Sequence, residues 1–329
     1  MFRDFIEKRE RTLHGRDNNR KSLPFEWGAE YIAPAISFDA FSSDTVANSD
    51  AFYSCPPTQH FRLDGNLLQF PSAVRSPYPE NNTVWGRYFD GGKDLCVVVL
   101  PQWNCRWDDV GLCRLLQSTG ISALRLSMPY HHRRKPAHLE RAEYLISPNI
   151  GRTISAARQS VLDARRAADW LLEVGHRRVG IIGTSIGSCI AFLTFAHDER
   201  FSAGVFIHVS GYYADVVWSG MSTSHVRRSL EGAIELDELR RVWLPISPFP
   251  FINRLKGTTR PMLALSGEYD MTFPVSLTED AYSEFRRLKI PINVKWLPCG
   301  HYTMGMFPFN AILAYSIVRF LRKMPAAPH

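Results

Sequence analysis

The chain has 329 residues, of which 45% are hydrophobic and 22% are charged, a composition typical of a globular protein. Its net charge of +7 comes from scattered Lys and Arg side chains, so we predict no nucleic-acid partner. The charged N-terminus lacks the apolar core of a signal peptide, and no apolar run reaches the roughly 18–20 residues needed to span a bilayer, so we expect a cytoplasmic protein without a membrane span.

The first 63 residues are predicted to form an N-terminal extension that packs on the main domain. They show no strong hydrophobic period, apart from Phe2, Phe5 and Ile6, which fit a short amphipathic helix that Leu13 could extend. The role of this extension and the oligomeric state are left open by the sequence.

Strands and helices alternate from about residue 64 onward, which predicts one α/β domain over residues 64–329. This pattern is typical of a mostly parallel, doubly wound sheet with right-handed crossovers. The predicted strands are 67–70, 83–89, 94–100, 121–126, 179–182, 203–207, 262–265 and 292–296. The predicted helices are 107–118, 152–174, 186–196, 275–288 and 309–323.

Residues 212–258 interrupt this alternation between two predicted sheet strands. The segment mixes aromatic residues with short helical pieces and three prolines. A long insertion at this place is typical of a cap over an active site. We therefore predict a cap whose side chains line the substrate site, namely Trp218, Met221, Trp243 and Phe249.

The stretch Gly183-Thr184-Ser185-Ile186-Gly187 reads G-x-S-x-G and lies between a predicted strand and a predicted helix. In that context the motif indicates a nucleophile elbow, a sharp turn that lifts the serine hydroxyl above the sheet. Glycines are needed there because neighbouring backbone passes close to the turn. The pattern predicts Ser185 as a nucleophile.

A serine nucleophile requires a base, and the base requires an acid to orient it. Asp270 and His301 each follow the carboxyl end of a predicted strand, where parallel sheets place their ligands. Together with Ser185 they form the predicted catalytic triad. Glu268 could also serve as the acid, and the other histidines that could serve as the base are His197, His208 and His225.

An oxyanion hole needs two N–H donors directed at the developing negative charge. We expect one from the backbone of Ile186, directly after the predicted nucleophile. The other should come from the loop after strand 94–100, through the backbone of Gln102 or Trp103.

A basic and aromatic stretch follows strand 121–126, which also points at the predicted active edge. Its side chains Tyr130, His131, Arg133 and Arg134 could bind a carboxylate or phosphate of the substrate. Alternatively, they form a solvated loop or pair with nearby carboxylates. His208, at the end of strand 203–207, is a further candidate for lining the pocket.

The G-x-S-x-G motif, Gly267-Glu268-Tyr269-Asp270 with Pro274, and Gly300-His301 together resemble the α/β-hydrolase superfamily over roughly residues 64–325. The stretch Met128-Pro129-Tyr130-His131 is similar to a little-characterised bacterial branch of it. One departure is that Pro101-Gln102 replaces the usual His-Gly of the oxyanion loop.

This resemblance implies a cofactor-free serine hydrolase that cleaves a carboxylic ester or thioester of a small-molecule acyl substrate through an acyl-serine. Two alternatives remain open: an acyltransferase or cyclase that uses the same intermediate, and a non-catalytic binding protein on the same fold. No metal or nicotinamide site is predicted, because the six cysteines form no Cys-x-x-Cys pair and G-x-G-x-x-G is missing.

Overall fold

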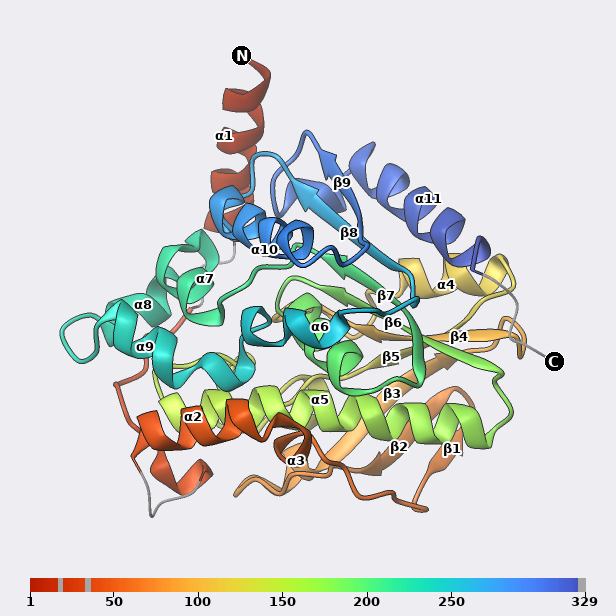
Figure 1. The fold of residues 1–329 in the computed structure, drawn as a ribbon, viewed down its shortest axis with the longest axis horizontal. Helices are drawn as coiled ribbons and strands as arrows, with labels where there is room; N and C mark the ends of the chain where they lie inside the picture. Colours follow the sequence, from red (N-terminus) through yellow and green to blue (C-terminus); the bar gives the residue numbers. More distant parts are fainter. Residues whose placement is uncertain (17–19, 33–36, 325–329) are drawn as a thin grey trace.

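A computed structural model describes residues 1–16, 20–32 and 37–324 of the chain. In that part of the chain a single nine-stranded sheet runs through the molecule in the order β1-β2-β3-β5-β4-β6-β7-β8-β9 (Figure 1). Strands β1, β2 and β3 pair antiparallel, as do β3 and β5, and the remaining neighbours pair parallel. The strands are β1 Arg62–Asp64, β2 Leu67–Pro71, β3 Thr83–Phe89, β4 Leu95–Leu100, β5 Ser122–Leu126, β6 Arg178–Thr184, β7 Phe201–Ile207, β8 Met262–Gly267 and β9 Asn293–Leu297.

Helices cover both faces of the sheet, so the predicted doubly wound α/β architecture is confirmed (Figure 1). The α-helices are α1 Phe2–Gly15, α2 Phe38–Ala47, α3 Ser49–Phe52, α4 Gly111–Ser118, α5 Ile150–Glu173, α6 Ile186–His197, α7 Tyr213–Ser219, α8 Ser224–Leu230, α9 Leu236–Val242, α10 Val275–Arg287 and α11 Phe309–Arg322. The 3₁₀ helices are η1 Ala29–Tyr31, η2 Pro79–Asn82, η3 His132–Arg134, η4 Met221–Thr223, η5 Leu244–Ile246, η6 Phe249–Leu255 and η7 Thr303–Gly305.

The position of strand β4 between two helical layers explains why its sequence is apolar without interruption. Side chains alternate between the two faces of a strand. Cys96 and Val98 pack in the core under α5 and α6, whereas Val97 and Val99 pack in the core under α4 and α11. All six residues of β4 are buried, as expected for a strand covered on both faces.

The N-terminal segment contains elements that the hydrophobic pattern does not reveal. The predicted short helix is present as α1, but α2, α3 and β1 were not predicted. Helix α2 carries little amphipathic signal and is capped by Ser37, whose Oγ accepts a hydrogen bond from the N–H of Ala40. Its contacts are made with distant parts of the chain: Ser42 Oγ donates to the carbonyl of Arg241 at 2.6 Å.

The segment between β7 and β8 is built from α7, α8, α9, η5 and η6. It lies beside the carboxyl ends of the central strands, and α2 packs against α9 and η5. Its division from the rest of the chain as a cap remains a prediction. Across the described residues, no helix is both long and apolar enough to cross a membrane.

Candidate active site

Ser185 lies in a strained turn between β6 and α6. Its φ of 58° and ψ of −125° are unfavourable for a residue with a side chain. The surrounding glycines make the turn possible. A Cβ on Gly187 would lie 2.3 Å from the carbonyl oxygen of Leu100, and one on Gly183 would lie 2.1 Å from the carbonyl oxygen of Gly187. The G-x-S-x-G pattern is therefore a steric requirement of this turn.

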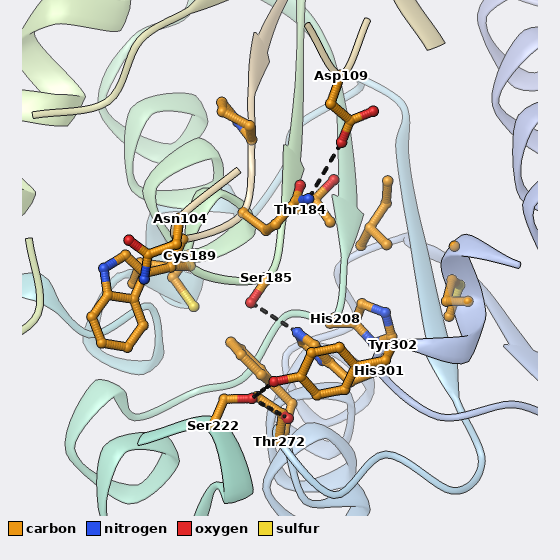
Figure 2. Close-up of a pocket in the computed structure, with 18 of the residues that line it drawn as sticks. Asn104, Asp109, Thr184, Ser185, Cys189, His208, Ser222, Thr272, His301 and Tyr302 are labelled. Atoms are coloured by element: carbon orange, nitrogen blue, oxygen red, sulfur yellow. Dashed lines mark hydrogen bonds between the residues drawn. The ribbon is translucent and has the colours of Figure 1, made fainter. Parts of the chain in front are cut away.

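Three side chains from distant segments form a continuous chain of hydrogen bonds. Ser185 Oγ lies 2.9 Å from His301 Nε2 (Figure 2), and His301 Nδ1 lies 2.9 Å from Asp270 Oδ2. Asp270 and His301 follow β8 and β9 at the same edge of the sheet as Ser185. The alternative acid, Glu268, is exposed, and the carboxylate that contacts His301 is that of Asp270. This arrangement can pass a proton from a serine hydroxyl to an imidazole.

The carboxylate of Asp270 is buried and fully engaged. Its Oδ1 accepts hydrogen bonds from the backbone N–H groups of Thr272 and Phe273 at 2.8 and 2.7 Å. Burial raises the pKa of Asp270, but its electrostatic and hydrogen-bonding interactions with the imidazoles of His301 and His208 outweigh burial and hold that pKa below its ordinary value. Asp270 is therefore ionised at neutral pH, as a group that orients an imidazole must be.

His208 packs against Asp270 and His301. Its Nδ1 lies 2.7 Å from Asp270 Oδ2, off the direction of a linear hydrogen bond, and its ring centroid is 4.3 Å from that of His301. His208 also has a left-handed φ of 60°, which is rare for a residue with a side chain. Burial lowers the pKa of His208, so it is neutral. As predicted, His208 lines the cavity at Ser185, where it lies behind the ring of His301.

The same three residues, His208, Asp270 and His301, are a potential set of metal ligands among the described residues. Their closest N···O distances are 2.7 and 2.9 Å. A metal bound to both atoms at about 2.0 Å in tetrahedral geometry would hold them more than 3 Å apart. The observed separations suit direct contacts between the side chains rather than an intervening ion.

The loop after β4 lies against the start of α6, where the oxyanion hole was predicted. Ile186 is the first residue of α6, so its N–H has no acceptor within the helix. The backbone N–H groups of Gln102 and Trp103 make no hydrogen bond in the described part of the chain, and both residues line the pocket. Which of the two is the second donor remains a prediction.

His131 holds this loop in place and does not line the pocket. Its Nδ1 donates to the carbonyl of Pro129 at 2.9 Å, which leaves Nε2 free to accept the N–H of Asn104 at 2.9 Å. Asn104 has a left-handed φ of 56°, and its Oδ1 accepts from the N–H of Ala142. The prediction that His131 binds substrate is wrong. Its ring is buried outside the cavity wall, and both ring nitrogens are hydrogen-bonded to the backbone of Pro129 and Asn104.

Buried neutral histidines should make the protein less stable in mild acid. Burial lowers the pKa of His131 to about 3, and burial likewise lowers the pKa of His197 to about 4. Between pH 6.5 and these values the unfolded chain binds more protons, so the free energy of unfolding should fall as the pH falls, by about 1.4 kcal/mol per pH unit for each such group. Urea unfolding of wild type and His131→Gln at pH 7 and 5 tests this. The variant should show a smaller pH dependence, and an equal dependence would contradict the assignment.

Ser185 opens into a cavity of about 500 Å³. On one side its wall is formed by Tyr213, Val216 and Val217 of α7, together with Cys189 and Phe273. A polar rim lies next to it, where Ser222 Oγ is 2.7 Å from Tyr302 Oη and 2.9 Å from Thr272 Oγ1 (Figure 2). The cavity is thus apolar near Ser185 and hydroxyl-rich towards the rim.

The aromatic residues predicted to line the site do not lie in the cavity wall. Trp243 is fully buried, packs against Tyr213 and donates from Nε1 to the carbonyl of Ile150. Phe249 stacks on Tyr212, and Trp218 lies under the guanidinium of Arg227. Met221 is also outside the wall. The prediction that these four residues line the site is wrong, because the apolar side chains of this segment pack against each other and against α5 and α2. The cavity wall is formed instead by Tyr213, Val216 and Val217 of α7.

The basic stretch after β5 is likewise structural. Tyr130 is buried in the core, and Arg133 lies over the ring of Trp85 at 4.7 Å. Arg134 is fully buried and pairs with Asp163 at 2.8 Å. None of these three lines the cavity, so the prediction that Tyr130 and Arg133 bind substrate is wrong and the alternative, arginines paired within the protein, holds for Arg134.

Several cavity residues were not found from the sequence. They come from segments without a recognisable motif, and they are Asn104, Cys189, Ser222, Thr272 and Tyr302. Cys189 follows Ser185 by one helical turn, a spacing that would have pointed to it. The position of Tyr302 directly after His301 would have done the same.

No family model and no curated protein matches the sequence of this chain. Solved structures do share its fold. An esterase of Pyrococcus furiosus matches with a TM-score of 0.56 at 16% identity, over 82% of this chain and 99% of that one. An acetyl xylan esterase of Thermoanaerobacterium sp. JW/SL YS485 matches with a TM-score of 0.59 at 14% identity, over 93% of this chain and 97% of that one.

An acylaminoacyl peptidase of Pyrococcus horikoshii matches with a TM-score of 0.60 at 13% identity, over 82% of this chain and 42% of the peptidase. An α/β hydrolase from a Penicillium species also matches, with a TM-score of 0.53 at 15% identity, over 80% of this chain and 99% of that one. These likenesses establish the α/β-hydrolase fold for this chain, as its motifs led us to expect.

Proposed function

We propose that this protein is a serine hydrolase that cleaves a carboxylic ester or thioester through an acyl-serine intermediate. The observation that carries the proposal is the hydrogen-bonded chain from Ser185 through His301 to Asp270, placed on a strained turn at the mouth of a cavity. The esterases among the structures with the same fold agree with this choice.

In the proposed reaction Ser185 Oγ attacks the substrate carbonyl carbon while its proton moves to His301 Nε2. Asp270 holds Nδ1 of the same ring and stabilises the imidazolium. The N–H of Ile186 and that of Gln102 or Trp103 stabilise the oxyanion. Collapse of this intermediate breaks the bond to the alcohol or thiol, which leaves with the proton from His301. Water then attacks the acyl-serine by the same steps and regenerates Ser185.

The decisive test has two parts. A fluorophosphonate probe should label the wild-type protein at Ser185, and a panel of p-nitrophenyl esters and acyl thioesters should show turnover. Labelling without hydrolysis, together with product formation when an alcohol or amine is added, would favour acyl transfer. Absence of labelling in folded protein would contradict a serine mechanism.

The wall formed by α7 should set the length of the acyl group. Val216 is nearly buried and contacts Cys189 and Phe273 in a small apolar cluster beside Ser185. A larger side chain there should fill the acyl space, so Val216→Phe should shift the preference among p-nitrophenyl esters to shorter chains. The change in kcat/KM should be worth about 1–3 kcal/mol for the longer esters, as for methylene discrimination in apolar pockets.

Trp218→Ala is the matched control, because Trp218 lies in the same helix but outside the cavity wall. It should leave the chain-length profile unchanged. A profile that moves with Trp218 and not with Val216 would place the acyl group elsewhere.

A further inference from the structure

Helix α1 reaches the segment that carries His301. Glu10 of α1 is 0% exposed, although its helix stands at the rim of the molecule with its N-terminal end pointing away from the sheet (Figure 1). Its Oε1 accepts a hydrogen bond from the backbone N–H of Thr303 at 2.7 Å, and Oε2 accepts one from the N–H of Tyr302 at 3.0 Å. A single carboxylate from the start of the chain thus binds the backbone directly after His301.

The residue before His301 also contacts this carboxylate. A Cβ on Gly300 would lie 2.4 Å from Glu10 Cδ, 2.6 Å from Cγ and 2.7 Å from Oε1. Gly300 therefore leaves the space that the Glu10 side chain fills. Glu10 meets the His301 loop on both sides of the imidazole-bearing residue, which restricts where that residue can lie.

The burial of Glu10 has an energetic cost that the loop offsets. Its carboxylate makes no ion pair in the described part of the chain, and burial of a charge without a cationic partner is unfavourable. The two N–H donors supply charge-assisted hydrogen bonds, which are stronger than neutral ones. Without Glu10 the buried N–H of Thr303 and the partly buried N–H of Tyr302 would lose this acceptor, so helix and loop stabilise each other.

A second contact ties the N-terminal segment to the same loop. The hydroxyl of Tyr302 lies 3.0 Å from a guanidinium nitrogen of Arg20 and 3.3 Å from Nδ1 of His14. That hydroxyl also contacts Ser222 on the cavity rim. The backbone and the side chain of Tyr302 are therefore both held by residues from the first 20 positions.

We propose that Glu10 is a positioning residue that holds the loop around His301 in the conformation in which Nε2 reaches Ser185. The N-terminal helix is then part of the active site, although it supplies no group that touches the reacting atoms. The inference deepens the proposed function and rests on it where activity is the readout.

The test compares Glu10→Ala and Glu10→Gln with Glu7→Gln in the full chain. Glu7 lies one turn earlier in α1 and pairs with Arg3 at 2.7 Å away from the loop, so it is the matched control. Glu10→Ala should lower kcat for a p-nitrophenyl ester by about tenfold or more, since two charge-assisted hydrogen bonds are lost, with KM unchanged. Glu10→Gln should lose less, because its amide oxygen can still accept one of the two N–H groups, and Glu7→Gln should match wild type.

A readout independent of hydrolysis separates this inference from the proposed function. The His301 Nδ1 proton, hydrogen-bonded to Asp270, should give a resolved downfield proton signal by NMR in wild type and in Glu7→Gln. The signal should broaden or vanish in Glu10→Ala, while the other resonances still show a folded protein. This comparison remains decisive if no ester is turned over. A folded Glu10→Ala protein that keeps this signal as in wild type would overturn the inference, whatever its kcat.

Gly300→Ala adds a test of the contact itself. Its Cβ would displace the Glu10 side chain, so it should lower kcat in wild type but cause little further loss in the Glu10→Ala background. Equal losses in the two backgrounds would show that Gly300 acts without Glu10 and would overturn the inference.

Discussion

Replacement of Ser185 by alanine is expected to abolish turnover, with kcat lowered by about 10⁶-fold, as for removal of the nucleophile in other triads. Among the described residues, Ser185 Oγ hydrogen-bonds to His301 alone, and the strained turn is maintained by the surrounding backbone. The thermal stability should therefore be close to that of wild type. Steady-state kinetics and thermal unfolding of the pure variant provide the measurement.

Ser222→Ala is the matched control for this substitution. Ser222 also lines the cavity, but its hydroxyl contacts Tyr302 and Thr272 rather than His301. It should change kcat by about tenfold or less, the cost of one hydrogen bond. If the Ser185→Ala protein keeps more than a few per cent of the activity, the acyl-serine mechanism is wrong.

Asp270→Asn is expected to lower kcat by about 10⁴-fold while the fold is retained. The asparagine oxygen can still accept the N–H groups of Thr272 and Phe273, which keeps the loop in place. Its amide nitrogen then faces Nδ1 of both His301 and His208, where an acceptor is needed. The ring of His301 would turn or adopt the tautomer that cannot accept the Ser185 proton.

Glu268→Gln provides the control for the choice of acid. Glu268 lies two residues earlier and is exposed, so its substitution should leave kcat near wild type. A larger loss in Glu268→Gln than in Asp270→Asn, measured as kcat at saturating ester, would show that the acid has been misassigned.

The sheet and the helices that cover it could be predicted because the sequence patterns that indicate them are local. The continuous apolar run of β4 reports burial on two faces, and the amphipathic period of α5 reports burial on one. Predicted strand and helix positions agree with the structure to within a few residues, with the largest shift at α4, which begins at Gly111 because a turn occupies the residues before it. The missed elements α2 and β1 are short and lack such a period.

The positions of Ser185, Asp270 and His301 could be anticipated for a topological reason. Each follows a strand, and parallel strands bring their carboxyl ends to one edge of the sheet. The cap side chains could not be placed in the same way. Trp243 and Val216 lie in one apolar segment, and whether a side chain faces the cavity or the core depends on how α7, α9 and α5 pack.

By itself, the sequence determined the α/β architecture, the strained turn at Ser185 and the order of the three candidate catalytic residues, because each depends on residue type and spacing over a short stretch. The tertiary structure alone decided that His131 supports the loop after β4, that His208 packs against His301, and that Glu10 binds the loop after His301. These roles arise from hydrogen bonds between segments far apart in the chain, such as the 292 positions between Glu10 and Tyr302. No local pattern encodes such a contact, because the partner's position is set by the packing of the whole fold.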